Sequence, residues 1–267
     1  MKASGHSNNC LVKTETGHMP RYFLSVSYLG TRYAGSQVQD NGQTIQGEIE
    51  RCLAILFRQA VSLTGSSRTD AGVHARKNYY HFDWEGEISG DPVYQLNALL
   101  PSDIAVREVV AVPEGAHSRF DATARRYIYT VYDQKSPFLH DRGWYYPYPM
   151  DLSLLNMAAG IILGEHDFTS FAKRNAQVHT HDCTIMASKW EFNNGIYSYT
   201  VQGNRFLRGM VRGLVATMVK VGRAKISLDE FAEILLSKDC TNADFSAPAK
   251  GLLLDDVIYP NGLLCHS

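Results

Sequence analysis

Cysteine is scarce and scattered in this sequence. The 267 residues include five cysteines, and no two of them have the C-x-x-C spacing. An odd number without paired spacing argues against a disulfide framework and is typical of a reducing compartment. No apolar run approaches the roughly 20 residues of a membrane helix, and the N-terminus lacks the apolar segment of a signal peptide. We therefore expect a cytoplasmic protein without a membrane span.

An excess of one charge is also missing. The 26 basic and 27 acidic residues give a formal net charge of −1, so the total gives no sign of a polyanionic partner. The distribution is more informative, because 201–227 contains no acidic residue and an acidic segment follows it. The neutral total therefore hides a local basic patch, formed by Arg205, Arg208, Arg212, Lys220, Arg223 and Lys225.

The chain contains no low-complexity segment or linker. Its first eighteen residues are polar and aperiodic, and Gly17-His18-Met19 resembles a cloning junction. We expect 1–18 to be a disordered or vector-derived tail and exclude it from fold reasoning. Pro113-Glu114-Gly115 is the expected boundary between an N-terminal half, 19–113, and a C-terminal half, 114–267.

Apolar periodicity predicts an α+β fold. In the first half, strands are expected at 21–29, 78–84 and 104–112, with helices following Thr44 and at 91–100. In the second half, we expect strands at 125–132, 189–192, 197–202 and 252–259, loops at 137–149 and 163–171, and helices following Asp151, at 206–222 and following Ser227. The pattern predicts two RRM/ferredoxin-like halves with mostly antiparallel sheets flanked by helices and an active-site cleft between them.

The predicted helix at 206–222 has a basic face. At 3.6 residues per turn, Arg205, Arg208 and Arg212 cluster nearly opposite the apolar face. Such a cluster suits an anion, either a phosphate or a catalytic carboxylate. A solvated charged face is an equally weighted alternative.

The segment 65–76 contains more reactive or conformationally special side chains than any other segment. Arg68 stands two residues before Asp70, and the small pair Ala71-Gly72 lets backbone or substrate approach closely. Neither helical nor strand periodicity occurs, so we expect a loop of the kind on which chemistry is often placed. Taken alone, the pattern more often means that the aspartate caps a turn and the arginine is solvated.

Six segments, taken together, resemble TruA-type tRNA pseudouridine synthases in the order expected for that family. The resemblance covers roughly 21–260 and departs at two places. Ser67 stands where the family usually has glycine, and Arg205 and Arg208 stand where less basic residues are common. The matching segments are 28–37, 65–75, 120–129, 164–171, 206–212 and 247–252.

The resemblance implies conversion of uridine to pseudouridine at positions 38, 39 or 40 of the tRNA anticodon stem-loop, without a cofactor or metal. It makes Asp70 the essential catalytic group, acting either as a nucleophile or as a base. It also implies that Arg212 pairs with this carboxylate and that Tyr127 stacks on the target base. A tyrosine on an alternating strand is more often a core residue, but the surrounding motif favours the catalytic role.

The resemblance further implies that the uridine is flipped out of the RNA, at a cost of a few kcal/mol. Arg68 is then the candidate to fill the vacated space. Homodimerisation is implied as well, with each tRNA contacting both subunits. The candidates for phosphate contacts, which position RNA without reading its sequence, are Arg125, Arg126, Lys173, Arg174, Arg205 and Arg208.

Three alternatives stay open at this point. His179, His181 and Cys183 would share one side of an extended segment and suit zinc, although no fourth ligand has matching spacing. A non-catalytic RNA-binding protein would need exposed aromatic side chains on a sheet, for which Tyr79, Tyr80 and Phe82 are candidates. A synthase with the same chemistry on another RNA is the third alternative.

Overall fold

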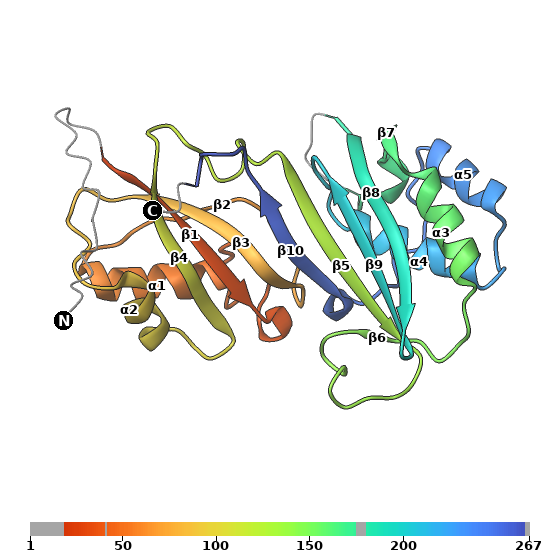
Figure 1. The fold of residues 1–267 in the computed structure, drawn as a ribbon, viewed down its shortest axis with the longest axis horizontal. Coiled ribbons are helices and arrows are strands. Elements are labelled where there is room, and N and C mark those ends of the chain that lie inside the picture. The colour runs from red at the N-terminus through yellow and green to blue at the C-terminus, as the bar shows by residue number, and fades with distance from the viewer. Residues whose placement is uncertain (1–18, 41, 175–179, 265–267) are drawn as a thin grey trace, which may run out of the picture.

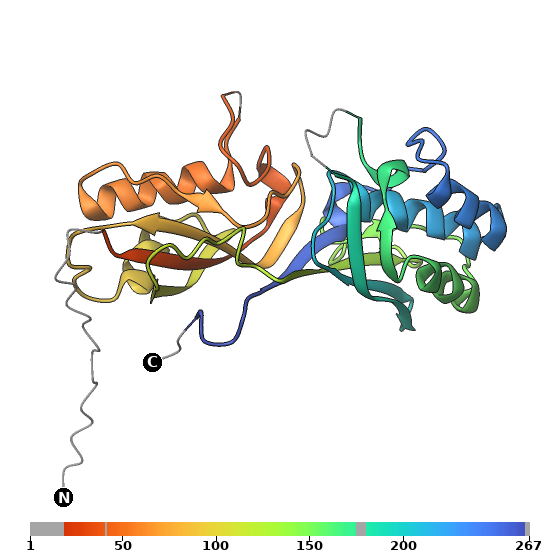
Figure 2. The ribbon, with the colours of Figure 1, turned by 90° about the horizontal axis from the view of Figure 1, so that it is seen from above.

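The computed structural model describes residues 19–40, 42–174 and 180–264. Its framework is a ten-stranded sheet with the strand order β4-β1-β3-β10-β5-β9-β8-β7, to which β2 adds beside β3 and β6 beside β5. The pairs β10–β3 and β5–β6 are parallel, and the other strand pairs are antiparallel. Helices α1 and α2 lie near one end of the sheet, and α3, α4 and α5 near the other (Figures 1 and 2). The predicted α+β class is confirmed.

The elements of each half follow the predicted rhythm with a few additions. The N-terminal half contains β1 (Arg21–Tyr28), α1 (Ile45–Phe57), β2 (Thr64–Gly65), β3 (His74–Asp83), α2 (Pro92–Leu99) and β4 (Ile104–Val112). The C-terminal half contains β5 (Ala124–Tyr132), β6 (Trp144–Tyr145), α3 (Leu152–Ile161), β7 (Gly164–Asp167), β8 (Asp182–Asn193), β9 (Ile196–Gly203), α4 (Met210–Gly222), α5 (Leu228–Leu236) and β10 (Leu252–Ile258).

Local sequence signals account for most element ends. The side chains of Thr44, Asp91 and Asp151 each accept a backbone N–H of the first turn of α1, α2 and α3, as expected for N-cap residues. Ser227 forms the predicted capping box at α5. Between β8 and β9, Asn194 and Gly195 both have positive φ, which is the backbone that a two-residue hairpin turn requires.

The prediction of one helix from Phe206 to Gly222 is wrong at its N-terminal end. Helix α4 begins at Met210, directly after Gly209, whose φ of +75° lies in the left-handed region. The preceding segment folds back instead, and the carbonyl of Arg208 accepts the backbone N–H of Lys173 at 2.9 Å. Only Arg212 of the three clustered arginines is therefore helical, and the expected basic helix face does not exist.

Two predicted loops contain strands. Residues Gly164–Asp167 form β7, which pairs with the first residues of β8 at the edge of the sheet. Residues Trp144–Tyr145 form β6, which pairs with β5. Strand β3 begins at His74, four residues before its predicted start. None of these short segments has an apolar and polar alternation of its own, so pairing with a neighbouring strand decides the backbone conformation.

The last strand lies at the centre of the sheet. In β10, Leu253 pairs with His74 of β3, and Leu254 pairs with both Ala75 of β3 and Tyr127 of β5. One sheet therefore runs through both halves, and β10 joins them. The division of the chain at residue 113 remains a prediction. No helix within the described ranges is both long and apolar enough to cross a bilayer.

Candidate active site

The loop that contains Asp70 is anchored by its buried neighbour Thr69. The Thr69 hydroxyl lies 2.9 Å from the Tyr28 hydroxyl of β1. Its backbone N–H donates to the Ser36 hydroxyl at 2.8 Å, and its carbonyl accepts the Ser36 N–H at 3.1 Å. These contacts hold the residue before the carboxylate from two directions, so the loop is not a free surface turn.

Asn78 holds the start of the same loop. Its side-chain amide donates to the Ser67 carbonyl at 3.0 Å and to the Tyr28 hydroxyl at 3.2 Å. Ser67 itself is buried and does not have a positive φ. The serine that stands where the resemblance implied glycine therefore fits without left-handed backbone.

The end of the loop is fixed by His74 and Gly30. The Gly30 N–H donates to His74 Nδ1 at 3.0 Å, so Nδ1 carries no proton, and Nε2 lies 2.9 Å and 3.2 Å from the carbonyls of Asp141 and Lys250. Burial lowers the pKa of His74, in keeping with a neutral ring. A Cβ on Gly30 would lie 2.0 Å from the Val73 carbonyl oxygen, so glycine lets the two segments touch.

Arg212 approaches Asp70 from helix α4. Its Nη1 lies 3.9 Å from the Asp70 carboxylate, and its Nε donates to the Ala247 carbonyl at 2.7 Å. The two side chains are 16% and 34% exposed. No hydrogen bond to the Asp70 carboxylate occurs within the described residues. The carboxylate is thus opposed by a cation but keeps its oxygens available to a substrate.

Tyr127 of β5 completes this group. Its ring is buried and meets Phe206 edge-on, with 5.1 Å between the ring centroids. Burial is the main cause that raises the pKa of Tyr127, and the negative charge of Asp70 adds to it. The phenol is therefore neutral near pH 7, and it can stack or donate a hydrogen bond but is a poor resting base.

Four of the predicted RNA-contacting residues lie around the turn before α4. Arg174 and Arg208 are exposed, whereas Lys173 and Arg205 are half-buried. The aliphatic part of Lys173 packs over Gly209, where a Cβ would meet it at 2.8 Å. These four basic side chains therefore gather at a turn and the neighbouring loop, whereas Lys220 of the predicted patch pairs with Asp244 at 2.9 Å.

Arg125 and Arg126 lie in different surroundings. The Arg125 guanidinium donates to the carbonyls of Ala122, Asn204 and Arg119 at 3.1, 3.0 and 2.7 Å. Arg126 forms ion pairs with Asp255 at 2.6 Å and with Asp256 at 3.6 Å. Both side chains thus hold structure together, and their roles in phosphate binding remain predictions.

Sequence reasoning missed the backbone of 247–250. Besides Ala247, which binds Arg212, the Pro248 carbonyl accepts the Tyr129 hydroxyl at 2.8 Å, and the Lys250 carbonyl lies against His74. Carbonyl groups have no side-chain signature. The resemblance of 247–252 to a family turn was the only available signal.

The structure also bears on the alternatives. Tyr79, Tyr80 and Phe82 are at most 2% exposed, so they cannot stack on RNA bases as a non-catalytic RNA-binding sheet would require. The zinc hypothesis depends on His179, which lies outside the described residues. Within the described ranges, no group of three or more His, Cys, Asp or Glu side chains could hold a metal ion.

Comparison with known proteins agrees with this geometry. A family profile described as tRNA pseudouridine synthase matches residues 158–260. The chain is 44% identical to tRNA pseudouridine synthase A of Parabacteroides distasonis over 248 residues, which cover 92% of this chain and 98% of that protein. It is 42% identical to the protein of the same name from Bacteroides fragilis, covering 90% and 96%, and 37% identical to that of Staphylococcus aureus strain MRSA252, covering 89% and 91%. The chain therefore belongs to the tRNA pseudouridine synthase A family, whose members isomerise uridine to pseudouridine in tRNA.

Proposed function

We propose that Asp70 is the essential catalytic group and that the substrates are uridines 38, 39 and 40 of the tRNA anticodon stem-loop. One observation supports the site most strongly. Asp70, Tyr127 and Arg212 come from three separate segments, and Arg212 lies 3.9 Å from the Asp70 carboxylate. A carboxylate, a cation and a buried aromatic ring brought together from separate segments are the arrangement expected of a catalytic site.

The isomerisation conserves atoms. The bond between N1 of uracil and C1′ of ribose breaks, a bond between C5 and C1′ forms, C5 loses a proton and N1 gains one. Asp70 would act either as a nucleophile on the ribose or the pyrimidine, or as a base on the ribose. In each case the Arg212 guanidinium places a positive charge 3.9 Å from the reacting carboxylate.

Tyr127 would stack on the target base and take part in moving the C5 proton. The charge of Asp70 helps to raise the pKa of this phenol. If Asp70 loses its charge by protonation or by forming a covalent bond, that contribution disappears and the phenol becomes more acidic. The two residues would therefore be coupled electrostatically during the reaction.

The uridine has to leave its stack to reach Asp70, at a cost of a few kcal/mol. Arg68 is exposed and stands two residues away, and we assign to it the space that the base vacates. Arg174 and Arg208, with Lys173 and Arg205 beside them, would bind phosphates. Affinity for tRNA should therefore fall as salt rises, and an affinity independent of salt would contradict these contacts.

We also propose a homodimer acting in the cytoplasm, with one tRNA contacting both subunits. A net charge of −1 gives one chain little general attraction for RNA. Two copies of the group Lys173, Arg174, Arg205 and Arg208 would offer one RNA twice the cationic surface.

The test is to incubate the protein with unmodified tRNA and to map pseudouridine at single-nucleotide resolution. Asp70→Asn should bind tRNA but form no pseudouridine, because the amide can act neither as a nucleophile nor as a base. Asp229→Asn is the matched control, since Asp229 is exposed on α5, remote from this site. Product in the Asp70→Asn reaction would refute the catalytic assignment, and product at other uridines would refute the positional assignment.

A further inference from the structure

An exposed aromatic side chain stands on a rigid turn next to the catalytic loop. Phe120 is 75% exposed, and the Arg119 guanidinium lies 5.9 Å from its ring centroid. The His117 ring also lies against the Phe120 ring, with 4.2 Å between the ring centroids. This aromatic ring contributes little to the core and faces solvent between a cation and an imidazole.

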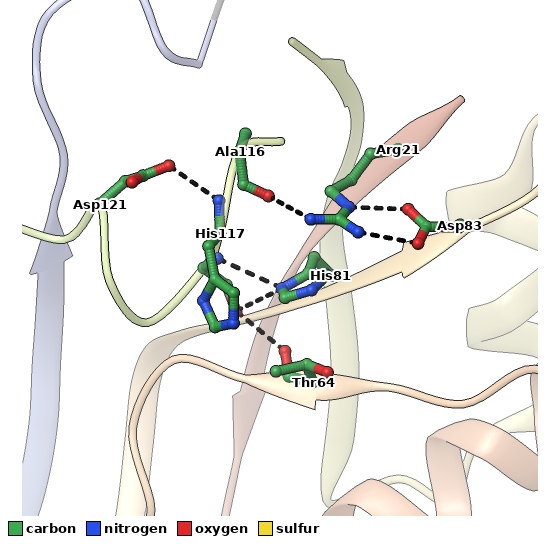
Figure 3. A network of polar contacts seen from close by, with 8 residues as sticks. Arg21, Thr64, His81, Asp83, Ala116, His117 and Asp121 are labelled. Atoms are coloured by element: carbon green, nitrogen blue, oxygen red, sulfur yellow. Dashed lines mark hydrogen bonds and ion pairs between the residues drawn. The ribbon is translucent and has the colours of Figure 1, made fainter. Parts of the chain in front are cut away.

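Hydrogen bonds hold this turn in place (Figure 3). His117 Nδ1 accepts the backbone N–H groups of Arg119 and Phe120 at 3.1 and 3.3 Å, and the His117 N–H donates to the Asp121 carboxylate at 2.7 Å. Buried Ser118 is bonded to His81 through both its N–H and its hydroxyl. The backbone that carries the exposed ring is therefore held in place, which lowers the entropic cost of stacking a ligand on it.

Phe120 shares a cavity with the catalytic loop. The cavity has a volume of about 230 Å³, below the roughly 300–1,000 Å³ of a typical small-molecule pocket. No acidic residue lines it, and its charged groups are Arg68 and Arg119. The lining side chains that could contact a ligand include Gln37, Arg68, His117, Arg119 and Phe120.

We propose that this cavity holds a second base of the tRNA substrate, next to the uridine bound at Asp70. The base stacks on Phe120, Arg119 binds the adjacent phosphate, and Arg68 separates the two bases. An aromatic face beside cations without acids is the combination that binds single-stranded nucleotides, and amide groups such as that of Gln37 suit base edges. This inference rests on the proposed function, because the occupant is part of the same RNA.

The position of Arg68 supports a shared occupant. Arg68 lines the cavity and is two residues from Asp70. An RNA strand with its flipped uridine at the Asp70 carboxylate would place the adjacent base beside Arg68, within reach of the cavity. Stacking of that base on Phe120 would stabilise the unstacked form of the RNA and offset part of the free-energy cost of flipping the uridine.

The test compares Phe120→Ala with Phe138→Ala in the Asp70→Asn background, so that the RNA stays unmodified. Phe138 is also strongly exposed, at 86%, but does not line the cavity. Stacking on an aromatic side chain contributes about 1–3 kcal/mol per base, so Phe120→Ala should raise the Kd for tRNA about 5- to 150-fold. Phe120→Trp should retain affinity, and Phe138→Ala should bind as the parent does.

A fluorescent base analogue, 2-aminopurine, placed at successive loop positions of the tRNA locates the stacked base. Its fluorescence should change at one position on binding, and the change should be lost in Phe120→Ala. Equal affinities and equal fluorescence for Phe120→Ala and its parent would overturn the inference. Pseudouridine formation by the wild type is measured separately, so failure of the base site and failure of the proposed function give different results.

Discussion

The buried imidazole of His81 should make the stability of this protein depend on pH. His81 is 6% exposed, and its Nδ1 accepts the Ser118 N–H at 3.2 Å and lies 2.9 Å from the Ser118 hydroxyl, which donates to the Thr64 carbonyl (Figure 3). Nδ1 therefore carries no proton. Burial, together with the positive charge of Arg21, lowers the pKa of His81 to about 4.

The size of the effect follows from proton linkage. An unfolded histidine has a pKa of about 6.5 and binds a proton as the pH falls below that value, whereas the folded chain stays unprotonated at this ring until about pH 4. Acid therefore favours the unfolded state. Between pH 7.5 and pH 5, the two pKa values correspond to a loss of about 2 kcal/mol of the free energy of unfolding.

Urea denaturation followed by circular dichroism at several pH values measures this loss. His81→Asn replaces Nδ1 with a neutral acceptor oxygen, so the variant should be less stable at pH 7.5 but should lose about 2 kcal/mol less than the wild type on acidification. His140→Asn is the control, because His140 is exposed, and it should follow the wild type. Identical pH dependence in the wild type and His81→Asn would refute the assignment of a neutral buried ring.

Two further substitutions test how the loop that contains Asp70 is assembled. Arg212→Ala removes the cation that lies 3.9 Å from Asp70. Single-turnover rates should fall about 10²- to 10³-fold, while circular dichroism shows a folded protein. Near-normal turnover would contradict the catalytic role of Arg212. Gly30→Ala places a methyl group 2.0 Å from the Val73 carbonyl oxygen, so the free energy of unfolding should fall by about 1–3 kcal/mol and turnover should fall with it. Gly160→Ala, which meets nothing within 4 Å, should leave both unchanged or stabilise the protein, and equal effects of the two glycine substitutions would exclude a special role for the contact.

The sequence predicted the elements whose signals are local. Helices α1, α3 and α5 begin directly after Thr44, Asp151 and Ser227, as expected, because an N-cap side chain satisfies free backbone N–H groups of its own first turn. The hairpin at Asn194-Gly195 is local in the same sense.

The failures occurred where distant segments decide the conformation. Phe206 and Met210 have helical spacing, yet Phe206 packs edge-on against Tyr127 and its neighbour Arg208 bonds to Lys173. These contacts outweigh helix propensity, which is small per residue. Strand β7 likewise exists because β8 pairs with it. A pattern within six or eight residues does not show which distant segment those residues will contact.

The candidate site shows the same division. Asp70, Tyr127 and Arg212 were identified through resemblance to a family, and the structure brings Asp70 and Arg212 within 3.9 Å. The groups that orient them, such as Thr69 and the Ala247 carbonyl, were not identified. A buried hydroxyl or a carbonyl has no distinctive residue pattern, so its role appears only when its partner is known.

Strand β10 explains how the parts of the site find their spacing. Leu254 pairs with Ala75 on one side and with Tyr127 on the other, so one strand separates the end of the Asp70 loop from the aromatic ring, at about 4.8 Å per strand interval. The turn that precedes β10 binds Arg212 through the Ala247 carbonyl. Strand β10 and the turn before it thus contact the segments that carry all three catalytic candidates, so their spacing depends on the pairing of this strand.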